Sequence, residues 1–480
     1  MRTFSGEIAQ HEGKEITLLG WVHARRDHGK LVFIDLRDRS GISQVVFPAG
    51  GGSASGGGPS LANANDLRLE YVVKITGEVK KRPPAMVNEK TPTGQYEVSA
   101  KTLEILSVSE ALPIPVDSDG YDVDEEIRMK YRYLDLRRER MRRNLRVRHE
   151  VARFIRTYLI EKGFWEVDTP ILTKSTPEGA RDFLVPSRLQ KGKFYALPQS
   201  PQQYKQMLMI AGVEKYFQIA RCFRDEDPRA DRAYGEFTQL DMEMSFVTQE
   251  DILQIAEDLF TKLCAAVFPE KKIMQTPWPR LTHKEAKAKY GNDKPDLRKD
   301  KNNPDELAFC WVIDFPLFTE QTKEDFFHGS GAAKFAPSHH MFTAPHPDDV
   351  PFLDTDPMKV RGLQHDMVLN GFEVGGGSVR IHQAKIQEKI FDLIGFSKEQ
   401  KEQFAYFLDA FAYGAPPHGG IAPGFDRFIY ATLGEKSVRE VIPFPASAGG
   451  ATSVMTAPSE VEKKQLDELG IEVKKPTSKK

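Results

Sequence analysis

Two short segments that lie far apart in the sequence each carry an arginine suited to binding phosphate. The first is Phe223-Arg224-Asp225-Glu226, and the second runs from Gly420 to Arg427. Both arginines occur where strand and turn residues are dense, and a guanidinium can donate two parallel hydrogen bonds to one phosphate. The pattern therefore predicts an enzyme that handles nucleotides without a P-loop.

Two alternating runs must position the first of these arginines. Large apolar residues recur at alternate positions between Phe217 and Phe223 and between Leu240 and Phe246, which predicts paired strands with one apolar and one charged face. In a half-exposed sheet the charged face would simply meet water, which is the commoner arrangement. The mixture of a guanidinium, acids and an amide favours a ligand instead. The charged face is predicted to carry Arg224, Glu226, Gln239, Asp241 and Glu243.

A predicted hairpin supplies two more carboxylates. Its centre, Asn370-Gly371, is the preferred sequence for a two-residue type I′ turn. Counting back from the turn pairs Met367 with Val374 and places Asp366 and Glu373 diagonally on one face. Two carboxylates at that spacing predict a magnesium site.

Arg380 follows on the same predicted strand as Glu373. Strict alternation would put these two side chains on opposite faces of the sheet. The triplet Gly375-Gly376-Gly377 lies between them, and we predict that it introduces a bulge that turns the strand over. As a phosphate-binding loop the triplet is only a weak signal.

The first hundred residues predict a small β-barrel such as the OB-fold. Short alternating runs extend over 16–47 and 72–98, and a Gly/Ser-rich stretch at 49–59 predicts a flexible surface loop between them. Phe33 falls on the face opposite the expected core, where a base could stack. We give equal weight to the alternative that Phe33 packs under the long loop.

A polar connector at 113–133 leads into a basic helix. Arginines are dense from Arg137 to Arg148, and a solvated helix face is the simplest interpretation. Apolar residues at helical spacing over 147–159 predict one buried stripe, and Gly163 is expected to end the helix. Residues 164–170 follow as a strand with a proline that suits a sheet edge or a dimer contact.

The composition predicts a soluble protein of two or three domains, with 480 residues of which 40% are hydrophobic. No apolar run approaches a membrane span and no secretory signal is evident, so we expect a cytoplasmic protein. The three cysteines are widely spaced, which indicates neither a disulfide framework nor a zinc site. The net charge of −2 provides no overall attraction to nucleic acid, so such binding needs local basic patches.

Together these segments resemble the class II aminoacyl-tRNA synthetases, and more closely the aspartyl-tRNA synthetases of the bacterial type. Residues 163–170 are similar to motif 1 of that class, 223–243 to motif 2 and 420–427 to motif 3. Residues 176–182 resemble the family's mobile loop, and 199–205 resemble its amino-acid pocket. The similarity covers nearly the whole chain.

The resemblance implies an α+β fold in three parts: an OB-fold anticodon-binding barrel at 1–107, a hinge at 108–140, and a catalytic domain at 141–480 with an antiparallel sheet flanked by helices. It also implies a homodimer through motif 1. The domain that the bacterial type usually inserts between motifs 2 and 3 is expected to be absent near 299–310, where the chain runs almost directly into the segment 311–316.

The resemblance implies L-aspartate as the amino acid. Lys205 and Arg380 would hold its side-chain carboxylate, and two cations there argue against neutral asparagine. Glu178 would receive the ammonium group. The residues expected around aspartate are Glu178, Ser200, Gln202, Lys205, Arg224, Asp241, His339 and Arg380.

ATP is the implied second substrate. Arg224 would bridge the α-phosphate and the aspartate carboxylate, and Arg427 would bind the far phosphates; these are the predicted catalytic residues. Mg²⁺ is expected on Asp366 and Glu373, and catalysis would rest on positioning and charge stabilisation. The aspartyl group would then pass to the 3′ end of tRNA. The residues expected around ATP are Arg224, Asp225, Glu226, Glu373, Gly424, Phe425, Asp426 and Arg427.

In the barrel, the resemblance implies that Arg26, Phe33 and Gln44 read the anticodon. Family members that charge both tRNA(Asp) and tRNA(Asn) tend to have a histidine at the position of His28 and a small residue near Ala85. This chain resembles that relaxed kind. A strictly tRNA(Asp)-specific enzyme is the alternative, because a histidine in a loop usually has no special function.

Besides the missing domain, three features depart from the family pattern. The motif 2 loop at 231–236 is one residue longer than usual, Pro423 replaces a common aromatic residue, and Met341 replaces a common proline. None of these removes a charged catalytic group, which argues against a non-catalytic RNA-binding paralogue. A tRNA-independent amidating enzyme would have no use for the barrel.

Overall fold

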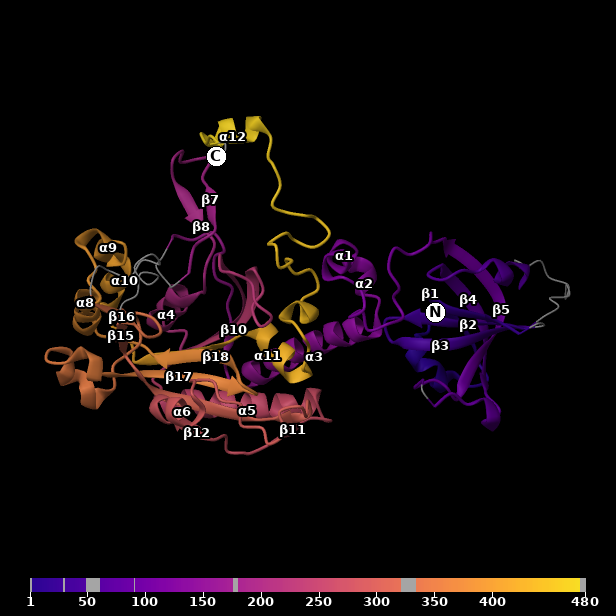
Figure 1. Cartoon of the computed structure of the whole chain (residues 1–480), viewed down its shortest axis with the longest axis horizontal. Helices are drawn as coiled ribbons and strands as arrows, with labels where there is room; N and C mark the ends of the chain where they lie inside the picture. The colour runs from indigo at the N-terminus through magenta and orange to yellow at the C-terminus, as the bar shows by residue number, and fades with distance from the viewer. Residues whose placement is uncertain are drawn as a thin grey trace. The chain divides into compact units, whose positions relative to one another are not determined.

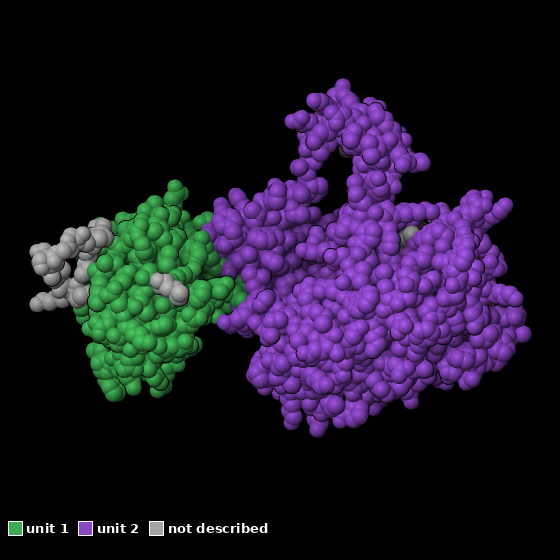
Figure 2. Space-filling view, turned by 180° about the vertical axis from the view of Figure 1, so that it is seen from behind, with its two compact units in different colours: residues 1–123, 137–142 green, residues 124–136, 143–480 purple. Residues whose placement is uncertain are grey.

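The chain folds into two compact units, which Figure 2 shows in different colours: residues 1–123 with 137–142, and residues 124–136 with 143–480. Each unit has its own hydrophobic core. Among the described residues, no helix combines the length and apolar character needed to cross a membrane. The computed structural model describes residues 2–28, 31–48, 61–89, 91–175, 180–320 and 334–474.

The first unit holds a closed five-stranded barrel with the strand order β1-β2-β3-β5-β4, which confirms the predicted OB-type barrel. Val32, Ile34 and Leu36 fill its core, and Phe33 lies on the opposite face. The Gly/Ser-rich stretch at 49–59 lies outside the described residues, and so does any packing of Phe33 beneath it. The elements are η1 (Ser5–His11), β1 (Glu15–Asp27), β2 (Leu31–Asp38), β3 (Gly41–Pro48), η2 (Leu61–Asp66), β4 (Val72–Lys81), η3 (Pro84–Met86) and β5 (Tyr96–Ser107).

The second unit is built on an eight-stranded sheet with the order β12-β14-β17-β18-β19-β10-β9-β6. Figure 1 labels β10, β12, β17 and β18 of this sheet. The six central strands are antiparallel, as predicted, but the edge strands β12 and β6 are parallel to their neighbours, so the sheet is mixed. The motif 1 strand is also shorter than expected, because only Trp165 and Glu166 pair with β9. The strands are β6 (Trp165–Glu166), β9 (Lys215–Arg224), β10 (Gly235–Ser245), β12 (Arg280–Thr282), β14 (Phe309–Pro316), β17 (Arg361–Leu369), β18 (Phe372–Val379) and β19 (His418–Pro423).

Helices α5, α11 and the later turns of α3 bury their apolar residues against one face of this sheet. Helix α3 has the predicted buried stripe, and it ends shortly before Gly163, whose φ is +81°. Helix α4 packs against β9 and β10. The helices are α1 (Glu125–Lys130), α2 (Arg132–Asp135), α3 (Glu139–Glu161), α4 (Gln202–Ile210), α5 (Gln249–Val267), α6 (His283–Tyr290), η4 (Pro347–Leu353), η5 (Pro357–Lys359), α8 (Ala384–Leu393), α9 (Lys398–Glu402), α10 (Ala405–Phe411), α11 (Phe425–Leu433), η6 (Val438–Val441) and α12 (Lys463–Leu469). Short strand pairs complete the unit: β7 (Leu184–Pro186) with β8 (Phe194–Ala196), β11 (Lys272–Ile273) with β13 (Glu306–Leu307), and β15 (Phe318–Glu320) with β16 (Phe335–Pro337).

The arginine run at the start of α3 is solvated only in part. Arg143 and Arg146 are exposed, as the composition suggested, whereas Arg138 is not. Arg138 is fully buried and donates to the backbone oxygen of Ser118 at 3.1 Å and to its hydroxyl at 2.7 Å. Further along the helix, Arg143 pairs with Glu435 at 2.8 Å. The partners of these arginines lie elsewhere in the sequence, so the local pattern of residues could not predict the contacts.

Candidate active site

A cavity of about 280 Å³ opens on the polar face of the central strands. Its walls come from β9, β10, β18 and β19, from the first turns of α4 and α11, and from the segment around His339. The sheet thereby gathers most of the residues that the sequence singled out. Those in the wall are Ser200, Gln202, Lys205, Arg224, Glu226, Gln239, Asp241, His339, Glu373, Arg380, Gly424, Asp426 and Arg427.

A β-bulge directs Arg380 into this cavity. The turn Asn370-Gly371 has φ values of 52° and 86°, as a type I′ turn requires. Beyond it, Met367 pairs with Gly375 and not with Val374, because Val374 is the extra residue of the bulge. The bulge therefore exists but lies one residue before the glycine triplet. The pairing that we counted from the turn was wrong at that position.

Four charged side chains form a buried cluster beside the cavity. Lys205 Nζ lies 2.9 Å from Asp241 Oδ2 and 3.4 Å from Glu243 Oε2. Arg380 donates to the two carboxylate oxygens of Glu243 from Nε at 3.0 Å and from Nη2 at 3.2 Å. All four residues have an exposure of 1% or less. Two cations and two anions compensate one another, which is what permits their burial.

The two carboxylates of this cluster differ. Burial raises the pKa of Asp241, and Lys205 offsets only part of that effect. Burial acts on Glu243 in the same direction, but Arg380 and Lys205 outweigh it, so the pKa of Glu243 is lowered. Asp241 Oδ1 is buried and has no hydrogen-bond partner among the described residues. A ligand with a cationic donor would satisfy that oxygen.

Two adjacent histidines complete this end of the cavity. Burial deep in the cleft, together with the nearby cations Arg380, Lys205 and Arg224, lowers the pKa of His339 to about 3. Burial also lowers the pKa of His340, and its Nε2 accepts from Arg380 Nη1 at 2.6 Å. Both imidazoles are therefore neutral near pH 7. The sequence reasoning named His339 but missed His340, which shares its segment and orients Arg380.

The other end of the cavity carries the two predicted phosphate-binding arginines. Arg224 Nε donates to the backbone oxygen of Gln199 at 3.3 Å, and its guanidinium stacks over the Phe237 ring at 5.1 Å. Arg427 Nη1 donates to the backbone oxygen of Glu373 at 2.9 Å. Each arginine keeps donors for a phosphate, because a guanidinium has five N–H groups.

The motif 2 loop adds residues that the sequence reasoning missed. Arg427 Nε donates to the backbone oxygen of Asp231 at 3.2 Å, and Arg232 pairs with Glu226 at 2.6 Å. Asp231 and Arg232 both line the cavity. Their spacing follows neither the period of a strand nor that of a helix. The sequence alone therefore could not predict that these two residues line the cavity.

Some predicted residues lie elsewhere. Phe425 is 3% exposed in the core and does not line the cavity. Asp225 does not line the cavity, and its carboxylate accepts a hydrogen bond from the Tyr234 hydroxyl at 3.2 Å. Asp426 touches the cavity, but its Oδ2 accepts from the Thr238 backbone N–H at 2.7 Å, so it also ties α11 to β10. Glu178 falls outside the described residues.

Asp366 and Glu373 converge above Gly376. A β-carbon on Gly376 would lie 3.2 Å from Asp366 Oδ1, 3.5 Å from Glu373 Oε1 and 3.6 Å from His339 Nε2. Burial and the charge of Glu373 raise the pKa of Asp366, and a cation between the two carboxylates would reverse that effect. The pair fits Mg²⁺, which commonly takes one or two protein carboxylates together with phosphate oxygens. Over the described ranges, no group of three or more His, Cys, Asp or Glu residues is arranged to hold a metal.

The barrel carries a separate polar surface on the outer face of β1–β3. Arg26 forms a bidentate pair with Asp35 at 2.7 and 2.8 Å and reaches Gln44 at 3.4 Å. The rings of His28 and Phe33 meet edge to face at 5.5 Å. The exposed or half-exposed residues predicted to contact tRNA are Arg26, His28, Phe33, Gln44 and Ala85.

Two family models match the chain. The model described as tRNA synthetases class II (D, K and N) matches residues 124–448. The model described as an OB-fold nucleic acid binding domain matches residues 16–106.

Similar proteins include the aspartate–tRNA(Asp/Asn) ligase of Moorella thermoacetica, which is 42% identical over 591 aligned positions that cover 97% of this chain and 95% of that protein. The aspartate–tRNA ligase of Staphylococcus aureus is 39% identical, with 96% and 97% covered. The structure of asparaginyl-tRNA synthetase from Pyrococcus horikoshii with asparaginyl-adenylate shares the fold, with a TM-score of 0.73 and 23% identity over 93% of this chain and 98% of that one. The chain belongs to the class II tRNA synthetases and, within them, to the aspartate–tRNA ligases.

Proposed function

We propose that this protein activates L-aspartate with ATP to form aspartyl-adenylate and transfers the aspartyl group to the 3′ end of tRNA(Asp) and of tRNA(Asn). The observation that carries the proposal is the buried cluster of Lys205, Asp241, Glu243 and Arg380. Three of these residues line the same cavity as Arg224 and Arg427, the two arginines predicted to bind phosphate. Relatives named as ligases for both tRNAs support the wider specificity.

Aspartate would bind with its side-chain carboxylate between Lys205 and Arg380. Both side chains have donors and no acceptors, so the amide NH₂ of asparagine would meet only donors there. The ammonium group would donate to Asp241 Oδ1, the acceptor that lacks a partner among the described residues, and to Glu178. Ser200, Gln202 and His339 complete the pocket wall.

ATP would lie along the other end of the cavity, with Arg224 at the α-phosphate, Arg427 at the far phosphates and Glu226 towards the adenine. One oxygen of the aspartate α-carboxylate forms the new bond to the α-phosphorus, the bond to the bridging oxygen breaks, and pyrophosphate leaves with both bonding electrons. No protein nucleophile or proton transfer is needed, so Arg224 and Arg427 act by orientation and by stabilising charge. A Mg²⁺ ion held by Asp366 and Glu373 would neutralise phosphate charge when bound.

Contact with tRNA would divide between the barrel and the catalytic unit. Phe33 would stack on an anticodon base, and Arg26 and Gln44 would bond base edges. His28 lies directly against Phe33, where it can influence which anticodon base is accepted. We assign residues 1–107 to anticodon binding, 108–140 to a hinge and 141–480 to catalysis.

We further propose a cytoplasmic homodimer that lacks the bacterial insertion near 299–310. The alignment to the Moorella thermoacetica relative contains more positions than this chain has residues, which supports the missing insertion. Around motif 1, Trp165, Ile171 and Leu172 are exposed at 64%, 42% and 52%, and a dimer interface would cover such apolar residues. A Trp165→Glu variant should shift the protein from dimer to monomer in analytical ultracentrifugation, and an unchanged sedimentation profile would contradict this interface.

The test of function is charging of purified tRNA(Asp) and tRNA(Asn) transcripts with labelled aspartate and ATP. Comparable charging of both is the expected result. Charging of tRNA(Asp) alone would make the enzyme strictly specific, and charging of neither would overturn the proposal. Labelled asparagine in place of aspartate should give no charged product.

A further inference from the structure

A network of buried arginines holds a short turn that forms part of the cavity wall. This turn is the short 3₁₀ helix η6 (Val438–Val441), and its first residue, Val438, lines the cavity. The arginines come from α1 and α2, more than three hundred residues earlier in the sequence and in the same compact unit as η6. These arginines have no role in the proposed binding of aspartate or in the proposed reaction at phosphorus.

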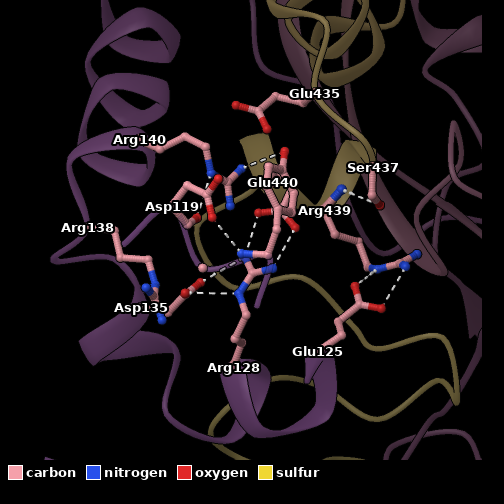
Figure 3. Close-up of polar contacts among 12 residues, drawn as sticks. Asp119, Glu125, Arg128, Asp135, Arg138, Arg140, Glu435, Ser437, Arg439 and Glu440 are labelled. Carbon is pink, nitrogen blue, oxygen red and sulfur yellow. Dashed lines mark hydrogen bonds and ion pairs between the residues drawn. The ribbon is translucent and has the colours of Figure 1, made fainter. Parts of the chain in front are cut away.

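The ionic part of the network is nearly inaccessible to solvent. Arg128 pairs with Glu440 at 2.6 and 3.1 Å and with Asp135 at 3.0 and 3.2 Å. Arg132 pairs with the same Asp135 at 2.7 Å. These four side chains are exposed by 4% or less. Figure 3 shows Arg128 between Asp135 and Glu440.

The second part of the network binds the backbone of the turn and of the residues that follow it. Arg132 Nη2 donates to the backbone oxygens of Arg439 at 2.7 Å and Ile442 at 2.8 Å, and its Nε donates to that of Pro443 at 2.9 Å. Asn144 donates to the backbone oxygen of Glu440 at 3.1 Å. Side chains thus satisfy carbonyl groups that a sheet or a longer helix would otherwise satisfy.

The turn is also tied directly to the residue that precedes the motif 2 loop. The Val438 N–H donates to the backbone oxygen of Ala230 at 2.8 Å. The next residue, Asp231, accepts from Arg427 at its backbone oxygen, and Arg232 follows in the cavity wall. Three hydrogen bonds, joined by the backbone between neighbouring residues, therefore connect α2, η6, the loop and the predicted ATP end of the cavity.

We propose that Arg128 and Arg132 are positioning residues for ATP: they fix η6 and, through it, the motif 2 loop that holds Arg427 and Arg232 in place. The inference rests on the proposed function. It predicts an effect on ATP and none on aspartate, because the aspartate cluster lies on α4, on β10 and at the residue that follows β18. In the hydrogen bonds and ion pairs of the described residues, this cluster makes no contact with η6. A buried ion network by itself is weak evidence for stability, so the two roles can be separated by experiment.

The decisive variant is Arg132→Lys. Lysine keeps the charge beside Asp135, but a single ammonium group cannot reach the three carbonyl oxygens that the guanidinium fork binds. We expect the KM for ATP in aspartate-dependent pyrophosphate exchange to rise about tenfold, the scale of one lost hydrogen bond to a charged group, and the KM for aspartate to change by less than about twofold. Glu440→Gln, a milder change of the same network, should raise the KM for ATP in the same direction.

Glu70→Gln is the matched control. Glu70 is a buried carboxylate in the first unit, where Arg37 and Arg137 bind it at 2.7 to 2.8 Å. Its loss should lower stability without changing either KM.

Titration calorimetry of ATP without aspartate gives a readout that does not need catalysis, and the same tenfold loss of ATP affinity is expected there for Arg132→Lys. An unchanged ATP affinity, or an equal rise in both KM values, would overturn the proposal. Wild-type protein that binds ATP but gives no exchange with aspartate would overturn the proposed function instead.

Discussion

Lys205 illustrates how closely binding and folding are linked at the level of single residues. It is buried to 1% exposure on α4, and it neutralises Asp241 while presenting its ammonium group to the cavity. Burying the Lys205 ammonium group without an acidic partner would destabilise the folded state. Burying the carboxylates of Asp241 and Glu243 without Lys205 would also destabilise it. The amino-acid pocket is therefore charged before substrate enters it.

Lys205→Met removes that charge and keeps most of the side-chain volume. Because a carboxylate of aspartate would lose one of its two cations, we expect kcat/KM for aspartate in pyrophosphate exchange to fall at least about a hundredfold. The control is Lys101→Met, which removes an exposed lysine paired with Glu15 on the barrel. A loss of less than about tenfold for Lys205→Met would contradict the assignment.

His365 gives a prediction about acid stability. It is fully buried on β17, and burial lowers its pKa from 6.5 to about 3. The unfolded state binds a proton below about pH 6.5 that the folded state refuses until about pH 3, so the free energy of unfolding falls as the pH falls through this window. In His365→Gln, denaturant titrations from pH 7 to pH 4 should show a shallower fall, by up to about 1.4 kcal/mol per pH unit. An unchanged slope would exclude the contribution.

At the level of elements, the glycine triplet Gly375-Gly376-Gly377 of β18 serves both strand packing and ligand binding. A β-carbon on Gly377 would lie 2.1 Å from the Gly420 backbone oxygen, so this glycine lets two strands approach. A β-carbon on the neighbouring Gly376 would instead enter the space between Asp366 and Glu373. One glycine serves folding, and the next keeps room for a ligand.

The variant Gly376→Ala separates the effect on ligand binding from the effect on folding. Its new methyl group would meet the ends of flexible carboxylates, so we expect a loss of stability below about 1 kcal/mol, whereas it would fill the space assigned to Mg²⁺ and phosphate. The KM for ATP at fixed Mg²⁺ should rise at least about tenfold. Gly377→Ala should prevent stable folding, as thermal unfolding would reveal. Gly449→Ala should change neither property, because a β-carbon there would meet only the Ser447 hydroxyl, at an ordinary contact distance of 3.7 Å. Normal ATP kinetics in Gly376→Ala would argue against the metal site.

At the level of the whole molecule, the two units are proposed to bind different partners: the anticodon of tRNA at the barrel, and aspartate and ATP at the second unit. The barrel carries Phe33 and its neighbours, and the cavity lies wholly in the second unit. Adenylate formation and tRNA recognition should therefore be separable by mutation.

Phe33→Ala should raise the KM for tRNA(Asp) by about tenfold, the energy of one stacked base, and leave pyrophosphate exchange unchanged. Tyr96→Ala is a suitable control because Tyr96 also lies on the barrel, where it packs against its core. Equal losses in charging and exchange for Phe33→Ala would contradict a role in anticodon binding.

The sequence alone determined the features that depend on neighbours along the chain. Alternation over β9 and β10 predicted two strands and the polar face that became the cavity wall, and Asn370-Gly371 predicted the hairpin turn. These patterns succeed because side chains of a strand alternate between faces and because few residues adopt positive φ in a tight turn.

The tertiary structure decided what depends on contacts between distant segments. The bulge residue, Val374, was displaced from the predicted triplet, since pairing with both neighbouring strands determines where an extra residue fits. Within the arginine run, Arg138 is buried beside Ser118, and just before the run Arg132 is buried against carbonyl groups about three hundred residues away. The physical reason is that burial of a charge depends on the groups that surround it in space, and a local sequence pattern contains no record of them.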